Sequence, residues 1–203
     1  MQHNAIVNPA TGKSYFRKRR ERIEEPSQAR ELTFSCYKQF QFLNYDRTRQ
    51  WFIDALREAR KESPFDLWAY VIMPEHVHLL VYPREKVEIG RVVGSMKEAV
   101  ARTAIHFLEV NAPEWLPRII VREGTRTRRR FWQPGGGYDR NVIALGTLRK
   151  MIDYIHMYPI RRGLVERPED WLWSSAGWYA GIRPVPIEID ATIPTTTEFI
   201  GKP

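Results

Sequence analysis

Apolar residues of this chain alternate with polar ones in some segments and recur at helical spacing in others. Alternation among strand-forming residues predicts a strand, and apolar positions three or four residues apart predict the buried face of a helix. In chain order these patterns predict a strand over 32–37, a helix over 46–61, strands over 65–73 and 76–82, a helix over 89–110, a short strand over 115–121 and a helix over 142–157.

The first six predicted elements follow the order strand, helix, strand, strand, helix, strand. That order is typical of the ferredoxin-like fold. We therefore expect an α+β domain in which an antiparallel sheet carries helices on one face, leaves the other face open and is followed by a C-terminal helix. The predicted domain spans 31–181, with a polar, basic arm over 1–30 and an irregular tail, rich in proline and threonine, over 182–203.

The charge of the chain narrows the class of partner. Its 203 residues have a formal net charge of +8, which favours an anionic partner, most commonly nucleic acid. A basic protein without such a partner is the alternative. The single cysteine, Cys36, excludes an internal disulfide. No apolar run is long enough to span a membrane and the N-terminus lacks a secretion signal, so we expect a cytoplasmic protein.

Two histidines lie two residues apart in the predicted strand over 76–82. Residues i and i+2 of a strand point to the same face, so His76 and His78 are expected to stand side by side. Adjacent neutral imidazoles on one rigid strand make half of a divalent-metal site. Two histidines that merely share a strand are the alternative.

A basic segment follows the second predicted helix. Arginines are concentrated between residues 122 and 130 and lead directly into Phe131-Trp132-Gln133. Rings beside arginines suit single-stranded nucleic acid, because bases stack on the rings while guanidinium groups meet phosphates. A solvated charged loop is the alternative. Three glycines, 135–137, then predict a hinge before Tyr138.

The last predicted helix carries a tyrosine beside its apolar stripe. Positions 145, 148, 152 and 155 form the stripe, whereas Tyr154 falls on the flank that it shares with Tyr158. Packing is the ordinary role of such a residue, but a phenol is also a covalent nucleophile when its electrophile is activated by a metal. Arg161 and Arg162, just past this helix, are expected to interact with its C-terminal dipole.

Four segments, in this order, resemble the HUH single-tyrosine transposases, and most closely the REP-associated tyrosine transposases. They are Tyr70–Leu80 with the histidine pair, Phe131–Gln133 with Tyr138–Arg140, Tyr154–His156 with Pro159 and Arg162–Val165, and Pro168–Trp171 with Trp173–Ser175. One segment alone would be a weak signal, whereas four in the expected order are specific. The resemblance covers residues 31 to 180.

The resemblance implies that 31–181 is an HUH transposase-like catalytic domain, a metal-dependent single-stranded DNA endonuclease and strand transferase that cuts at palindromic repeat hairpins. His76 and His78 would hold Mg²⁺ or Mn²⁺, and Tyr154 would attack phosphorus to form a 5′-phosphotyrosine intermediate. Such a protein is expected at the nucleoid, as a monomer or homodimer. The residues expected to contact the hairpin DNA are Arg126, Arg128, Arg129, Arg130, Trp132, Gln133, Tyr138 and Arg140.

One position departs from the family pattern. The family usually has asparagine or glutamine one helical turn after the tyrosine, where it completes the metal site, and here that position is Tyr158. A neutral phenol is a poor ligand for a hard cation. Three explanations compete: another residue supplies the third ligand, two histidines and water suffice, or the protein binds hairpin DNA without cutting it. The candidate third ligands are Glu75, Asp153, His156 and Tyr158.

Two further interpretations remain. Tyr154 and Tyr158 would be a pair of nucleophiles one turn apart, as in two-tyrosine relatives of this family. In the second interpretation, the protein is a hydrolase of a small substrate or an RNA-processing enzyme. The arginine-rich, aromatic segment argues against a small substrate.

Overall fold

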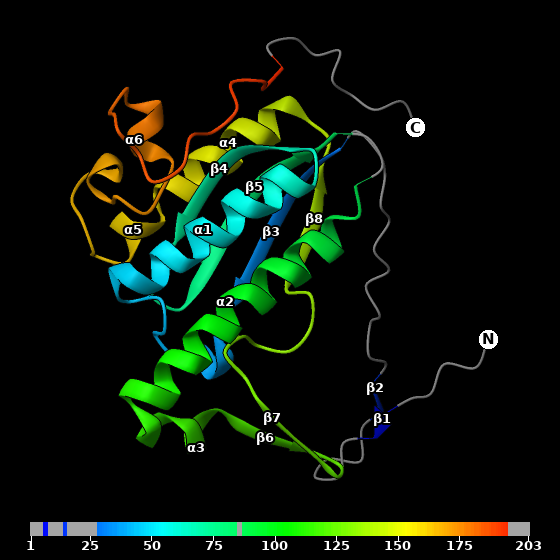
Figure 1. Cartoon of the computed structure of the whole chain (residues 1–203). Coiled ribbons are helices and arrows are strands. Elements are labelled where there is room, and N and C mark those ends of the chain that lie inside the picture. Colours follow the sequence, from blue (N-terminus) through cyan, green and yellow to red (C-terminus); the bar gives the residue numbers. More distant parts are fainter. Residues whose placement is uncertain (1–5, 8–13, 16–27, 85–86, 195–203) are drawn as a thin grey trace.

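A four-stranded antiparallel sheet forms the centre of this chain in a computed structural model (Figure 1). Its strands lie in the order β4-β5-β3-β8, with bounds β3 (Ala29–Ser35), β4 (Phe65–Ile72), β5 (His76–Pro83) and β8 (Tyr138–Val142). The structure describes residues 6–7, 14–15, 28–84 and 87–194. Most of the predicted arm over 1–30, and the predicted tail beyond 194, lie outside the described residues.

The strand β5 is hydrogen-bonded along both edges, to β4 and to β3. Its register with β3 sets Ser35 opposite His76 and Thr33 opposite His78. Residues that point to either face of β4 and β5 are buried, because helices cover both faces of this part of the sheet. The strand β5, which carries the histidine pair, is therefore held by strands at both edges and by helices on both faces.

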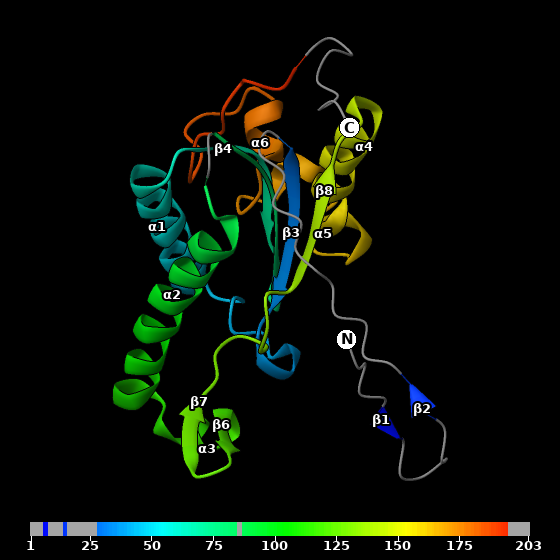
Figure 2. The same ribbon diagram turned by 90° about the vertical axis from the view of Figure 1, so that its right-hand side faces the viewer.

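Helices α1 (Asp46–Glu62) and α2 (Ile89–Asn111) cover one face of the sheet (Figure 2). Their apolar stripes include Phe52 of α1 and Met96 of α2, which are buried in one core with Leu79 of β5. Both helices begin at the predicted residue and end one residue later than predicted. The α+β class and the antiparallel sheet with helices are thus confirmed, while the ferredoxin-like assignment stays a prediction.

The second face of the sheet was expected to be open, and this expectation is wrong. The helix α4 (Leu145–His156) packs on it, as the edge-on view shows (Figure 2). Leu148 and Ile155 of α4 are buried in a second core with Val71 of β4 and Leu80 of β5. The apolar stripe of α4 buries the apolar residues on this face of the edge strand β4 and the central strand β5.

The fourth strand of the sheet is β8, and the prediction of a strand over 115–121 is wrong. That segment forms a 3-10 turn, a short helix and the start of a separate hairpin, in which β6 pairs with β7. Two prolines at helix-starting positions favour the turn and the helix. The bounds are η2 (Pro113–Trp115), α3 (Leu116–Ile119), β6 (Ile120–Glu123) and β7 (Arg126–Arg129).

Two features fix β8 against β3. Gly137, just before β8, has a φ of 77°, and a Cβ atom there would lie 2.2 Å from the backbone oxygen of Thr33, so only glycine fits. Arg30 of β3 and Asp139 of β8 form two hydrogen bonds of 2.9 and 2.7 Å with both side chains buried. A bidentate pair of this kind is geometrically specific.

The chain after α4 folds back over the sheet and α1. The helix α4 ends at His156, one residue before the predicted end, and Pro159 lies in the first turn of α5, where its missing N–H is tolerated. Residues 182–194 lack helix and strand, as expected of the tail, yet Ile187 and Ile189 are buried in the same core as Phe52. The remaining elements are β1 (Ile6–Val7), β2 (Ser14–Tyr15), η1 (Tyr37–Gln39), α5 (Tyr158–Arg161), η3 (Pro168–Asp170) and α6 (Ala176–Tyr179). No described helix is both long and apolar enough for a bilayer.

Candidate active site

His76 and His78 stand side by side on the α4-facing side of β5, as their spacing predicted. Their ring centroids are 4.9 Å apart and the rings are nearly perpendicular, at 82°. Both side chains are buried. The two imidazoles are therefore held in a fixed mutual arrangement by the central strand.

Each imidazole makes a hydrogen bond through its Nδ1 atom. The Nδ1 atom of His78 lies 2.8 Å from the Thr33 hydroxyl, and that of His76 lies 3.2 Å from Oε1 of Glu75. The Nε2 atom of each ring is buried and has no hydrogen-bond partner among the described residues. Two orphaned ring nitrogens on one face fit a bound cation, since a ligating histidine usually uses its other nitrogen for an orienting hydrogen bond.

Burial keeps both imidazoles neutral at physiological pH. It lowers the pKa of His78 to about 3, with the neighbouring His76 as the second cause. Burial also lowers the pKa of His76, and the carboxylate of Glu75 opposes that shift. The neutral form is the one that binds metal, so no proton has to be displaced near pH 7.

Glu75 is held from its other side by an arginine. Nη1 of Arg162 lies 2.6 Å from Oε1 of Glu75, the same oxygen that meets Nδ1 of His76. Glu75 stays a candidate for the third metal ligand: its Oε1 atom orients His76, while its Oε2 atom is buried and has no hydrogen-bond partner among the described residues. Arg162 was expected to serve only the dipole of the last helix, and its guanidinium instead pairs with this buried carboxylate.

Tyr154 and Tyr158 lie over the histidine pair, one helical turn apart. The Tyr158 ring centroid is 5.1 Å from that of His76 and 4.6 Å from that of His78, and the Tyr154 ring is 6.1 Å from His78. The Tyr154 hydroxyl donates to the Tyr158 hydroxyl across 3.4 Å. With 37% of its surface exposed, Tyr154 is reachable from solvent.

The surroundings of Tyr154 keep its phenol protonated. The hydrogen bond to Tyr158 and partial burial raise the pKa of Tyr154 to about 12. The guanidinium of Arg161 lies 4.9 Å from the ring centroid and acts in the opposite direction. The hydroxyl would therefore lose its proton only as it reacts.

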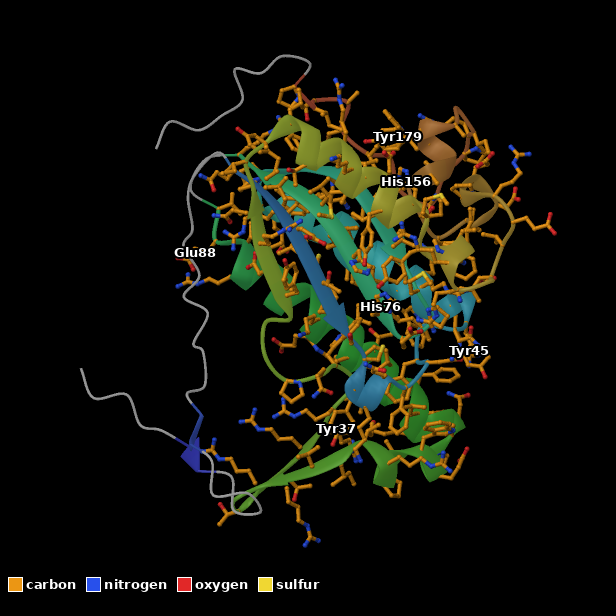
Figure 3. All side chains as sticks on the ribbon, turned by 180° about the vertical axis from the view of Figure 1, so that it is seen from behind. Tyr37, Tyr45, His76, Glu88, His156 and Tyr179 are labelled. Atoms are coloured by element: carbon orange, nitrogen blue, oxygen red, sulfur yellow. The ribbon has the colours of Figure 1, made fainter. Side chains whose placement is uncertain are left out.

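The other candidates for a third ligand lie elsewhere. His156 points to the opposite side of α4, where its Nε2 atom is 2.8 Å from the Ser175 hydroxyl; Figure 3 shows it beside Tyr179 and apart from His76. Asp153 is exposed on α4. Within the ranges that the structure describes, no group of three or more His, Cys, Asp or Glu side chains is placed to hold a metal. The two imidazole nitrogens are therefore the metal ligands that we propose, and Glu75, substrate or water remain for the further positions.

The arginines predicted to contact DNA are carried mainly by the hairpin of β6 and β7, which projects from one end of the molecule (Figures 1 and 2). Arg126, Arg128 and Arg129 are exposed on β7, and Arg129 also pairs with Glu109 of α2. Arg130, just after the strand, is half-buried. The predicted loop is therefore a two-stranded hairpin with exposed arginines on one of its strands.

Trp132 does not belong to that surface. It is 6% exposed, its indole donates to the backbone oxygen of Lys97 across 2.9 Å, and its ring meets that of Phe34 edge-on at 5.3 Å. The prediction of Trp132 as a DNA contact is contradicted, because its ring is part of the core. Gln133 beside it is exposed, and its side chain accepts a hydrogen bond from the backbone of Lys38.

Two more of the predicted DNA contacts lie on β8, at the edge of the sheet. Arg140 is exposed and pairs with the buried Glu31 at 3.0 Å, and Tyr138 is half-buried. Burial raises the pKa of Glu31, and Arg140 opposes the shift. Both β8 residues share a face of the sheet with the histidine pair, because alternate residues of paired strands point to the same side.

Sequence reasoning missed Thr33 and Arg162 as parts of this site. Thr33 is found only from the register of β3 against β5, which no local pattern shows. Arg162 had a signal, since it lies within a segment that carries the family resemblance, but its role depends on the way α5 folds back toward the turn at Glu75.

Comparisons with known proteins relate this chain to transposases. Residues 30–113, which include the histidine pair, match the family model described as "Transposase IS200 like". A Haemophilus influenzae protein, whose name assigns it provisionally to the REP-associated tyrosine transposases, is 27% identical over 152 residues, 67% of this chain and 77% of its own. The solved structure of a REP-associated tyrosine transposase bound to a REP hairpin is 18% identical, with a TM-score of 0.64, and the match covers 92% of this chain and all of that one. That likeness shows a shared fold.

Proposed function

We propose, from the membership of this chain in the IS200-like transposase family, that it cuts and rejoins single-stranded DNA at palindromic repeat hairpins. The observation that carries the proposal is the exposed Tyr154, whose ring lies 6.1 Å from that of His78, beside two buried imidazoles with orphaned Nε2 atoms. A metal-dependent phosphoryl transfer needs a nucleophile close to the groups that bind the metal, and the tyrosine beside the two imidazoles fits this requirement.

His76 and His78 are the residues that would hold Mg²⁺ or Mn²⁺. When bound, the metal supplies Lewis-acid polarisation of the scissile phosphate. Thr33 and Glu75 keep the two rings in orientations that aim Nε2 into the site, and Arg162 keeps Glu75 in place. These side chains set the geometry before substrate arrives.

Tyr154 is proposed as the nucleophile. Its Oη atom forms a bond to phosphorus, the bond from phosphorus to the 3′ oxygen breaks, and the products are a 5′-phosphotyrosine and a free 3′-hydroxyl. The phenolic proton passes to solvent as that bond forms, because the raised pKa keeps it in place beforehand, and the departing 3′ oxygen takes up a proton from solvent to become the hydroxyl. Rejoining is the reverse reaction, in which a 3′-hydroxyl attacks the phosphotyrosine and Tyr154 regains its proton.

Hairpin DNA is the proposed substrate. The solved relative carries a REP hairpin, and this chain offers exposed arginines on β7 and a net charge of +8 for the phosphates of a folded strand. With such a substrate, the protein would act on chromosomal repeats in the cytoplasm. It would do so as a monomer or a homodimer.

A second candidate is a hairpin-binding protein that has lost cleavage. The specific observation in its favour is Tyr158, whose ring packs against both imidazoles at the position where the family usually has an amide. A phenol in that place adds no good oxygen ligand for Mg²⁺.

A denaturing gel separates the two candidates. Purified protein is incubated with labelled single-stranded hairpins from repeats that flank its own gene, with Mg²⁺ or Mn²⁺. We expect a covalent protein–DNA band that disappears in Tyr154→Phe. Tight binding of the same hairpins without such a band, in either metal, would support the non-catalytic candidate.

A further inference from the structure

Arg161, the last residue of α5, lies beside the proposed nucleophile. Its guanidinium carbon is 4.9 Å from the ring centroid of Tyr154, and the side chain is exposed. The helix α5 begins one residue after α4 ends and lies on the same face of the sheet (Figure 2). Residues seven apart share one flank of a helix, and side chains lean toward the N-terminus. The long side chain of Arg161 therefore extends back along this flank to Tyr154.

The end of α5 does not explain the position of this arginine. Three carbonyls in the last turn of the helix, those of residues 158–160, accept hydrogen bonds of 2.8 to 3.1 Å from the backbone N–H groups of residues 162–164. These carbonyls are the groups that a basic side chain at a helix end would otherwise meet. The guanidinium of Arg161 points away from them, toward a ring two helical turns back.

Arg161 also lacks the acidic partner that nearby arginines have. Arg162 pairs with Glu75, and Arg140 pairs with Glu31 on the same side of the sheet. Among the residues that the structure describes, no carboxylate forms an ion pair with Arg161, and its contact is with the Tyr154 ring. A cation over the face of an exposed ring is held weakly, so this guanidinium can turn to an arriving anion at little cost.

The anion that has to approach Tyr154 is the phosphate under attack. In a productive complex its phosphorus lies about 3–3.5 Å from the attacking oxygen. A guanidinium beside the tyrosine ring is then a near neighbour of the non-bridging oxygens of that phosphate. Its planar fork of N–H donors matches the geometry of a phosphate, which a lysine ammonium does not.

We propose that Arg161 is a catalytic residue, which binds a non-bridging oxygen of the scissile phosphate and stabilises its charge while Tyr154 attacks. The inference rests on the proposed function and adds a residue to it. Catalysis of phosphoryl transfer consists mainly of positioning and electrostatic stabilisation. Arg161 contributes charge and hydrogen bonds but no proton, because a guanidinium stays protonated in proteins. Since Tyr158 adds no good metal ligand, a positive charge from the protein itself is of particular value in this chain.

A hairpin with a neutral linkage at the cleaved position tests this role. The parent protein is first used to map that position. A second hairpin of the same sequence then carries a methylphosphonate there, in which a methyl group replaces one non-bridging oxygen and removes the negative charge. Single-turnover rates of strand cleavage are measured on both hairpins at saturating protein.

The variants separate charge from structure. Arg161→Gln removes the charge and keeps most of the side chain, and Arg161→Lys keeps the charge without the planar fork. Arg149→Gln is the matched control. Arg149 is also an exposed arginine, but it precedes His156 by seven residues, and so it lies on the flank of α4 that faces away from Tyr154.

On the ordinary hairpin we expect Arg161→Gln to cleave about 100-fold more slowly than the parent, and Arg161→Lys to regain part of this loss. On the methylphosphonate hairpin the parent and Arg161→Gln should differ by less than about threefold, because no charge is left to stabilise. Arg149→Gln should behave as the parent on both. Affinity for the ordinary hairpin, measured without metal in a Tyr154→Phe background, should fall less than about threefold in Arg161→Gln, since one phosphate contact among many is lost.

The outcomes separate this inference from the proposed function. Cleavage by Arg161→Gln at the parental rate overturns the inference, and so does an equal loss of rate on both hairpins, which is the mark of a structural role. If the methylphosphonate hairpin is cut too slowly to measure, equal losses in Arg161→Gln and Arg161→Lys overturn it. A loss of affinity that accounts for the whole loss of rate would assign Arg161 to general phosphate binding instead. If the parent leaves the ordinary hairpin uncut, the proposed function itself fails and the inference fails with it.

Discussion

Arg162 and Glu75 form an ion pair of 2.6 Å that connects the end of α5 to the turn before β5. Through Glu75 the pair reaches Nδ1 of His76, so this arginine orients the imidazole that we propose as a metal ligand. We expect Arg162→Ala to lower the rate of adduct formation by about 10- to 100-fold, the usual effect of losing such a group.

The dependence on metal concentration tests this role of Arg162. The concentration of Mn²⁺ needed for half-maximal adduct formation should rise in Arg162→Ala and recover in part in Arg162→Lys. Arg167→Ala, which removes an exposed arginine paired with Glu169, is the control and should behave as the parent. Equal metal dependence of parent and Arg162→Ala would remove Arg162 from the site.

Tyr154 and Tyr158 have different expected roles despite their hydrogen bond. Tyr154→Phe should abolish the covalent adduct, whereas Tyr158→Phe should retain it, because only Tyr154 combines exposure with a place beside His78. Time courses of adduct formation with both variants check this. An adduct that persists in Tyr154→Phe and disappears in Tyr158→Phe would reverse the assignment.

Replacing Tyr158 tests whether the missing amide matters. Tyr158→Asn restores the side chain usual in the family and removes the ring that packs on both imidazoles. We expect it to lower the Mg²⁺ concentration needed for cleavage, since an amide oxygen is a better ligand for a hard cation than a phenol. If the parent forms no adduct and Tyr158→Asn does, Tyr158 is the cause of lost activity.

The histidine pair itself should be indispensable. His76→Ala and His78→Ala are each expected to abolish cleavage, because each removes one of the two orphaned Nε2 atoms. Hairpin affinity measured without metal should change little, since the arginines proposed to meet the phosphates lie elsewhere, mainly on β7. Normal cutting by both variants would show that the metal is held by other groups.

His156 should make stability depend on pH. Burial lowers its pKa to about 4, against an ordinary value of 6.5, so the unfolded chain binds a proton in this window that the folded chain does not. Stability is then complete above pH 6.5 and falls as the pH drops toward 4. Between pH 7 and pH 5 the contribution of His156 amounts to about 1–2 kcal/mol.

Denaturant unfolding of the parent and of His156→Gln at pH 7 and pH 5 isolates this contribution. Glutamine can keep a hydrogen bond to Ser175 but does not titrate. His76 and His78 are present in both proteins, so their own titration cancels. The difference in free energy of unfolding between the two pH values should be smaller in His156→Gln by the stated amount, and an identical difference would contradict the prediction.

The arginines of β7 should govern the salt dependence of binding. Arg126 and Arg128 are exposed on one strand, and the double change to alanine removes two candidate phosphate contacts. We expect the slope of the logarithm of the binding constant against the logarithm of salt concentration to become shallower by about 1.5. An unchanged slope would mean that the hairpin of β6 and β7 does not face the DNA.

Local sequence patterns correctly predicted those elements whose structure follows from a single hydrophobic periodicity. Alternation placed His76 and His78 on one face of β5, and helical spacing gave the starts of α1 and α2. The packing of α4 on the second face of the sheet could not be predicted in this way. The apolar stripe with Leu148 and Ile155 shows that the helix is buried on one side, but it does not identify the element against which it packs.

Other parts of the fold depend on partners far away in the sequence. The strand β8 is short and follows three glycines, and its place comes from the pair of Asp139 with Arg30, 109 residues earlier. Trp132 resembled a DNA contact because it follows the arginines, yet the space between Phe34 and Phe52 takes its ring into the core. Neither contact can be predicted from a short stretch of the sequence.

The packing of α4 also limits how the covalently attached strand can travel. Leu148, Ile152 and Ile155 anchor the tyrosine-bearing helix to β4 and β5, and lifting it away would expose all three, at a cost of about 5 kcal/mol or more. In the proposed reaction, a phosphate linked to Tyr154 would therefore stay in one place on the protein. One DNA end would then be exchanged for another by sliding or refolding of the nucleic acid, while the helix α4 keeps its position on the sheet.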